Sequence, residues 1–269
     1  LLGKHFQDHI DCNVAIVEPV DARSFHRTFD NIFSRGFKYH PKLRLDPTER
    51  ARRNTLNVAA TMAFAGDAEE ALDQLKTTAK NLLRGRIREV HAAEVGFAAR
   101  NLPLLTRQVV RYGLQHRAYV PPDARIFLRV HCEQEPTSGS SITLSDRRDS
   151  IGLLRTRLDW RISERELETI REYLQVATES LAGLARIVPD EDLISGNPDF
   201  LLRCDDSNHH MGGMRMSTSE TTGVVDSNLR LYGLSNTYVC SSAVFPTSGF
   251  SNPTHTLLAL AVRLSEHLG

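Results

Sequence analysis

Residues 154 to 166 constrain the fold most strongly, because a strand pattern runs directly into a helix start. Apolar side chains at alternate positions from Leu154 to Ile162 share one face, and charged side chains share the other. This alternation predicts a half-buried antiparallel strand. Ser163-Glu164-Arg165-Glu166 then has the form of a capping box, which predicts a helix from there to Pro189.

Other stretches add to a mixed pattern of strands and helices. β-branched and apolar runs predict four further strands, at residues 12–20, 56–64, 125–131 and 141–145. Helical spacing predicts three further helices, at residues 67–84, 88–117 and 254–269. Asp67 is the expected N-cap of the first, and Pro103 starts or kinks a segment of the second. This order favours an α+β fold with an antiparallel sheet.

Composition limits the classes of function. The chain has 269 residues, enough for one large domain or two modest ones. Lys plus Arg and Asp plus Glu both number 33, so net charge gives no reason to expect a nucleic acid partner or binding to an anionic membrane. No apolar run is long enough to span a bilayer.

The amino-terminal residues lack the apolar stretch of a signal peptide, and the chain does not begin with Met. We therefore expect a piece of a longer, soluble protein, and its compartment, cytoplasmic or periplasmic, stays open. The four cysteines are widely scattered, and none forms a C-x-x-C pair. They are expected to be buried or half-buried free thiols rather than zinc ligands.

His209 and His210 form the first candidate site, and residue types alone allow three interpretations. The pair could bind a metal ion with nearby aspartates, one imidazole could act as a general base, or both could be ordinary histidines. Adjacent side chains on an extended chain point to opposite sides. This geometry argues against one metal ion shared by both histidines.

Asn252-Pro253-Thr254 form the second candidate site, at the start of the last helix. Asn is a favoured N-cap, and Pro is favoured at the first helical position. The free amides of a first helical turn present partial positive charge, which stabilises an anion placed before them. A well-capped helix without a ligand is the simpler alternative.

The carboxy-terminal region resembles the glucose–methanol–choline (GMC) family of flavin-dependent oxidoreductases. The similar stretches are HHMGGMRM (209–216), GVVDSNLRLYGLSNTYVCSSAVFPTSG (223–249) and NPTHTLLALAVRL (252–264). Two distant stretches also resemble the family, namely LGKHFQDH (2–9) and residues 133–163. The resemblance is specific at the carboxy-terminal end and weak between residues 20 and 125.

The resemblance implies a domain order and a cofactor. Residues 1–11 would end one FAD-domain segment, residues 12–200 would form the substrate-binding domain, and residues 201–269 would return to the FAD domain. The expected fold is thus an α+β substrate domain with an antiparallel sheet, joined to the carboxy-terminal segment of an α/β FAD-binding domain. A turn-rich joint, Ser195-Gly196-Asn197-Pro198, precedes the second boundary.

The resemblance also implies roles for individual residues. His209 falls on the catalytic base of the family's H-x-x-G pattern, and Asn252 falls on its His or Asn partner. The implied reaction oxidises an alcohol or sugar CH–OH group, with hydride passing to flavin N5. The implied cofactor contacts come from His210, Ser241, Ser242, Ala243, Pro253 and Thr254.

Two departures from the family pattern stand out. Ser241 occupies a position where many members have Asp, and the G-x-G-x-x-G loop that seats the pyrophosphate is absent from these residues. FAD binding is therefore expected to need an amino-terminal half. Two alternatives remain: a lyase of the hydroxynitrile type with a structural flavin, and a non-catalytic relative. The substrate and the electron acceptor, whether oxygen, a quinone or a cytochrome, are left open.

Overall fold

The computed structural model describes residues 1–66, 102–121 and 124–269. The helix expected at residues 67–84 and the first part of the one expected at 88–117 lie outside these residues. The first half contains β1 (Ile10–Pro19), α1 (Ala22–Phe29), β2 (Ile32–Ser34), β3 (Phe37–Tyr39), β4 (Leu43–Arg44), α2 (Pro47–Arg53), β5 (Val58–Ala65), α5 (Leu102–Gln115) and β6 (Arg125–Cys132). The second half contains β7 (Ser141–Arg148), β8 (Leu154–Asp159), α6 (Glu164–Leu181), β9 (Ala185–Pro189), α7 (Glu191–Ser195), the 3₁₀ turn η2 (Pro198–Arg203), β10 (Asp205–Asp206), the 3₁₀ turn η3 (Ser242–Val244) and α8 (Thr254–Leu268).

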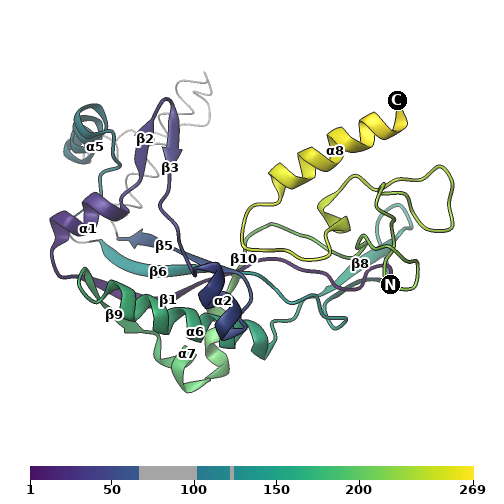
Figure 1. Cartoon of the computed structure of the whole chain (residues 1–269), viewed down its shortest axis with the longest axis horizontal. Helices are drawn as coiled ribbons and strands as arrows, with labels where there is room; N and C mark the ends of the chain where they lie inside the picture. The colour runs from purple at the N-terminus through teal and green to yellow at the C-terminus, as the bar shows by residue number, and fades with distance from the viewer. Residues whose placement is uncertain (67–101, 122–123) are drawn as a thin grey trace.

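A six-stranded sheet organises the described residues, in the order β10-β1-β6-β5-β4, with β9 also paired to β1 (Figure 1). Each pairing between its named strands is antiparallel. Helix α6 packs against this sheet, and Ile170 and Leu174 of α6 join Val14 and Leu128 of the sheet in one core. The expected α+β fold with an antiparallel sheet is confirmed.

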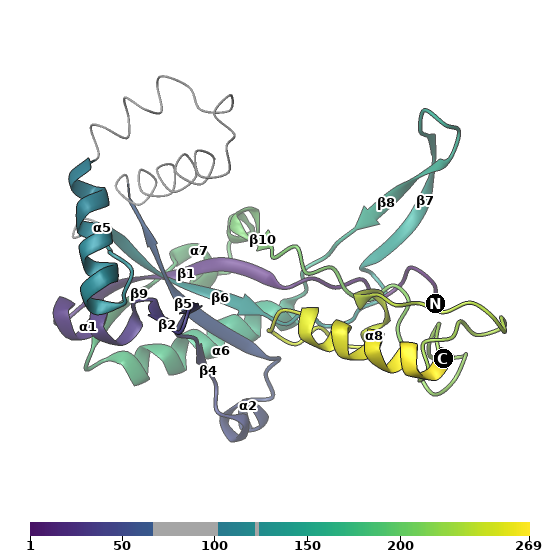
Figure 2. The same ribbon diagram turned by 90° about the horizontal axis from the view of Figure 1, so that it is seen from above.

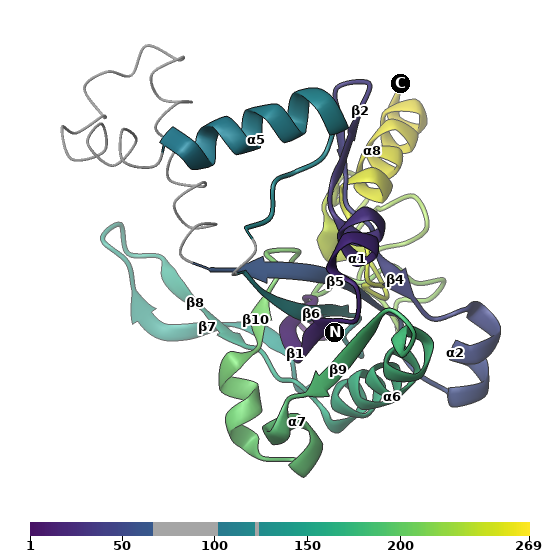
Figure 3. The same ribbon diagram turned by 90° about the vertical axis from the view of Figure 1, so that its left-hand side faces the viewer.

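A second, smaller core lies at the carboxy-terminal end. Helix α8 and the long loops before it bury Met211, Val225, Leu229, Val244, Phe245 and Leu264 together. Figure 1 shows α8 apart from the main sheet, on the same side of the molecule as the amino terminus. In Figure 3 α5 likewise lies away from α6, α7 and β9. None of the described helices is both long and apolar enough to cross a membrane.

The strand expected at residues 154–162 exists, but it is not half-buried. Strand β8 pairs with β7 in a separate two-stranded hairpin, which projects away from the sheet in Figure 2. Leu158 is 52% exposed and Leu144 on β7 is 67% exposed. Alternation shows that one face of a strand is apolar, but nothing in the described residues covers that face.

Two other local expectations need correction, and some short helices were not predicted. The capping box at Ser163 is present, but α6 ends at Leu181, and residues up to Pro189 form β9. Strand β9 pairs with β1, a contact that helical spacing in the sequence does not reveal. Helices α1, α2 and α7 were not predicted, and Asn252 does not cap α8. The cap position of α8 is Pro253, with no side-chain capping hydrogen bond.

Candidate functional site

Two segments nearly 200 residues apart pair to build the candidate site. The amides of Gln7 and Met211 each donate to the other's carbonyl, at 2.8 Å. This bridge places His9, just before β1, beside His209, just before Met211. The loop that carries η3 joins them, because Ser242 Oγ donates to the His210 carbonyl at 2.7 Å.

A buried carboxylate organises the loop around His209. Asp8 is 1% exposed. Its Oδ1 accepts from three backbone amides, those of His9 at 2.6 Å, Ser207 at 3.3 Å and His209 at 3.2 Å. Hydrogen bonds to a charged acceptor are stronger than those between neutral groups. Asp8 therefore fixes the backbone on both sides of the contact between the two histidines.

The imidazoles of His9 and His209 meet directly. Their Nδ1 atoms lie 3.1 Å apart, and the rings meet edge to face with centroids 5.1 Å apart. His9 is 1% exposed, whereas His209 is half-buried. Burial lowers the pKa of His9; the Ser248 backbone opposes this in part, and the positive form of His209 adds a smaller lowering effect. One ring must donate and the other accept, so at least one of them is neutral at this contact.

His210 faces different partners. Its exposed imidazole places Nε2 3.4 Å from Asp8 Oδ2, and its ring centroid lies 5.7 Å from that of Phe6. The two neighbouring histidines thus lie against separate groups. His210, Asp8 and Asp206 each offer one possible metal-ligand atom within 4.8 Å of the others. His209 is not a member of that group.

Gly212 lets the two segments approach each other. Its φ of +75° lies in the left-handed region, and a Cβ there would lie 2.0 Å from the His5 carbonyl oxygen. Any side chain at this position would collide with backbone. The glycine that follows the histidine pair is therefore required by a close contact between segments, which explains the H-x-x-G spacing physically.

The loop from Phe245 to Gly249 reaches the same site. Ser248 is buried, and its Oγ accepts from the Gln134 amide at 3.2 Å. The Gly249 amide donates to Glu133 Oε1 at 3.1 Å. This loop also lines a hollow of about 410 Å³, whose wall includes Asn252 and Pro253.

The other residues predicted from the sequence occupy the edges of this site. Asn252 is exposed, and no hydrogen bond joins it to His209 in the part of the chain that the structure describes. Thr254 is the exposed first residue of α8. Ser241 caps η3 by accepting from the Ala243 amide at 3.2 Å, and Ser242 holds His210 as described. These residues surround the His209 loop without forming one contact network.

Sequence reasoning missed three buried residues. Gln7, Asp8 and His9 are each at most 1% exposed. In the part of the chain that the structure describes, one side-chain atom on each makes no hydrogen bond, namely Gln7 Oε1, Asp8 Oδ2 and His9 Nε2. The run of polar residues immediately before an apolar strand was a usable signal, since such side chains are seldom buried without a reason.

Comparison with known proteins shows which proteins this chain is similar to. Residues 136–261 match the family model described as GMC oxidoreductase. A 2-methyl-1,2-propanediol dehydrogenase from Mycolicibacterium austroafricanum is 25% identical over 167 residues, covering 61% of this chain and 29% of that protein. A C-glycoside 3-oxidase from Microbacterium trichothecenolyticum is 26% identical over 149 residues, covering 55% and 28% respectively. The chain thus spans less than a third of the length of these two relatives.

A solved structure shows the same fold. The pyridoxine 4-oxidase from Mesorbium loti aligns with 99% of this chain and 43% of its own length, at a TM-score of 0.50 and 14% identity. Residues 136–261 thus match the GMC oxidoreductase family, in the carboxy-terminal portion of the chain. The resemblance seen in the sequence is confirmed.

Proposed function

We propose that the whole protein oxidises the CH–OH group of an alcohol or sugar with FAD, and that His209 is the base. The observation that carries this proposal is the contact between His209 and the buried His9, 3.1 Å between Nδ1 atoms. It supports the assignment of His209 rather than His210, because His209 is held by a second ring and by Asp8 through its amide. A general base needs this kind of fixed orientation.

The residues present fit a bound flavin. The hollow beside Asn252 and Pro253 lies at the start of α8, where no side chain caps the free amides. Those amides would favour a negatively charged group placed before them. His210, Ser241, Ser242, Ala243, Pro253 and Thr254 are the residues that would hold the cofactor. When bound, FAD supplies the acceptor for the hydride.

The contact between His9 and His209 determines which of their ring nitrogens carry a proton. In the productive tautomer the Nδ1–H of His209 donates to Nδ1 of His9, which leaves Nε2 of His209 free to take the substrate hydroxyl proton. The lowered pKa of His9, caused mainly by burial, keeps that ring neutral and able to accept. When His209 becomes positive, its bond to His9 is retained, so the ring does not turn away. Asn252 holds the substrate oxygen through its amide without competing for the proton.

The test replaces the base in the full-length protein. His209→Ala should lower the rate of anaerobic flavin reduction by an alcohol substrate about 10² to 10⁴-fold, the usual contribution of a general base. The flavin absorbance of the purified variant checks that cofactor is still bound. His267→Ala, near the far end of α8, is the matched histidine control and should reduce its flavin at the normal rate.

Other outcomes separate the alternatives. Flavin reduction at the normal rate in flavin-loaded His209→Ala protein would show that His209 is not the base. Cleavage of a cyanohydrin, with no flavin reduction by any alcohol or sugar, would identify a lyase instead. A protein that neither reduces its flavin nor cleaves a cyanohydrin would be a non-catalytic relative.

A further inference from the structure

Cys12 and Cys204 face each other across two paired strands. In the antiparallel pairing of β1 and β10, Ile10 lies opposite Asp206 and Asp11 lies opposite Asp205. One further step in the same register places Cys12 opposite Cys204, whose backbone is extended. Directly opposed residues have Cα atoms about 4.5–5.5 Å apart, inside the roughly 4.4–6.8 Å range that a disulfide spans.

Packing agrees with this register. Cys204 packs against the core that contains Cys12. The interaction between the two thiols raises the pKa of Cys12, with burial adding to the rise, and lowers the pKa of Cys204, whose Sγ also donates to the Phe200 carbonyl at 3.5 Å. The positive Arg203 also lowers the pKa of Cys204, against the opposing effect of partial burial. Cys204 is half-buried and follows the positive Arg203, whereas Cys12 is buried, so Cys204 is the thiol that an oxidant reaches first.

We propose that Cys12 and Cys204 form a reversible dithiol–disulfide pair, with a low-molecular-weight disulfide as the oxidant. The Cys204 thiolate attacks one sulfur of the oxidant, which forms a mixed disulfide and releases one thiolate. Cys12 then loses its proton to that thiolate and attacks the Cys204 sulfur, which releases the second half of the oxidant as a thiolate that takes a proton from solvent. Two electrons pass from the two cysteines to the oxidant, whose halves end as two thiols.

The other two cysteines do not share this arrangement. Cys132 is fully buried, its pKa is raised by burial, and its thiol donates to the Glu133 carbonyl at 3.2 Å. It lies opposite Ile10 on β6, two positions from the residue that faces Cys12. Cys240 is exposed, which departs from the buried or half-buried state expected for the cysteines. These two residues are therefore natural controls.

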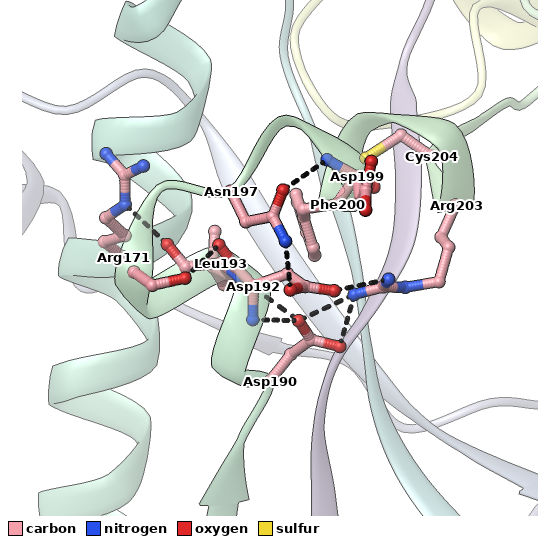
Figure 4. A network of polar contacts seen from close by, with 10 residues as sticks. Arg171, Asp190, Asp192, Leu193, Asn197, Asp199, Phe200, Arg203 and Cys204 are labelled. Atoms are coloured by element: carbon pink, nitrogen blue, oxygen red, sulfur yellow. Dashed lines mark hydrogen bonds and ion pairs between the residues drawn. The ribbon is translucent and has the colours of Figure 1, made fainter.

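The position of Cys204 gives the bond a structural consequence. Figure 4 shows Cys204 at the end of the η2 turn, beside Phe200 and Arg203. Arg203 is already held by Asp190 at 2.8 Å and by Asp192 at 2.7 Å. Because the chain runs from Cys204 through β10 to the amide of His209, a disulfide would tie the start of that loop to the central strand β1. The thiol pair itself does not depend on the proposed reaction.

The test uses the full-length protein with Cys240→Ser, which removes the exposed thiol. Incubation with oxidised glutathione, then alkylation under denaturing conditions and peptide mass spectrometry, should reveal a Cys12–Cys204 crosslink that dithiothreitol removes. Cys12→Ser in the same background should instead accumulate glutathione on Cys204. A crosslinked peptide that contains Cys132 would overturn the proposal. It would also be overturned if Cys204 carried only glutathione while Cys12 remained a free thiol and was alkylated. Complete alkylation of both residues after incubation would overturn it as well.

Discussion

Gly212 offers the sharpest test of the close approach that builds the site. Gly212→Ala would place a Cβ 2.0 Å from the His5 carbonyl oxygen and 3.0 Å from its carbonyl carbon. Backbone atoms cannot swing aside like the end of a side chain. Gly36, in the turn between β2 and β3, has a similar φ of +80°, but no atom of the described residues lies within 4 Å of a Cβ placed there. Gly36→Ala is therefore a control with the same backbone strain and no collision.

The two variants should differ by the cost of the collision. Holding a non-glycine residue in the left-handed region costs about 1–2 kcal/mol of stability, and both variants lose this. Forcing extra volume into a packed contact costs about 1–3 kcal/mol more, and only Gly212→Ala loses that. We expect losses of about 1–2 kcal/mol for Gly36→Ala and about 2–5 kcal/mol for Gly212→Ala.

Urea unfolding of both variants measures these losses, provided that the slope m stays constant. In thermal unfolding, the extra 1–3 kcal/mol would lower the midpoint of Gly212→Ala by about 2–12 °C relative to the control. If Gly212→Ala loses no more stability than Gly36→Ala, the carbonyl of His5 is not against Gly212 in solution. The pairing that brings His9 to His209 would then need another explanation.

Two further predictions concern buried ionisable groups. Glu166 is fully buried and accepts from the amides of Ser163 at 2.7 Å and Glu135 at 2.8 Å. Glu166→Ala should cost about 1.5–3 kcal/mol in urea unfolding, more than Glu168→Ala on the exposed face of α6, and equal losses would contradict the capping geometry. Burial lowers the folded-state pKa of His9 and His131 below the usual value of 6.5. The free energy of unfolding should therefore be highest above about pH 6.5 and decrease as the pH falls, because the unfolded chain binds protons that the folded chain does not. His9→Gln should make the free energy of unfolding depend less on pH.

Local patterns predicted the elements that depend on local forces. Strands β1 and β6 and the start of α6 appear where their residues indicate, since an apolar β-branched run, alternation and a capping box are properties of neighbouring residues. The prediction of where α6 ends was wrong for the opposite reason, because that end depends on a distant segment. Leu184 fits helical spacing, yet β9 begins at Ala185 because β1 offers it a strand partner. Pairing between strands far apart in the sequence overrides weak local preference.

The residues of the candidate site likewise fall into two groups, those predicted from a local motif and those brought in from a distant segment. His209 and the residues expected to contact a cofactor came from a motif contained in the last quarter of the chain. Its buried partners, His9 and Asp8, lie 200 residues away. They are brought there by the pairing of Gln7 with Met211 and by the neighbouring pairing of β1 with β10. The Cys12–Cys204 contact was invisible for the same reason, because spacing along the chain says nothing about register between strands.

The unpaired polar atoms beside His209 are informative because of their cost. A buried polar atom with no hydrogen-bond partner costs about 1–3 kcal/mol, and stable folds keep few of them. Here Gln7 Oε1, Asp8 Oδ2 and His9 Nε2 occur on consecutive residues. Gln7 and Asp8 are otherwise tied down, Gln7 through its backbone bridge to Met211 and Asp8 through three amides. His210 Nε2 approaches Asp8 Oδ2 to 3.4 Å, which leaves hydrogen-bonding capacity on this fixed segment. Such capacity is a property expected of a site that completes its contacts when another molecule binds, and His209 lies at its edge.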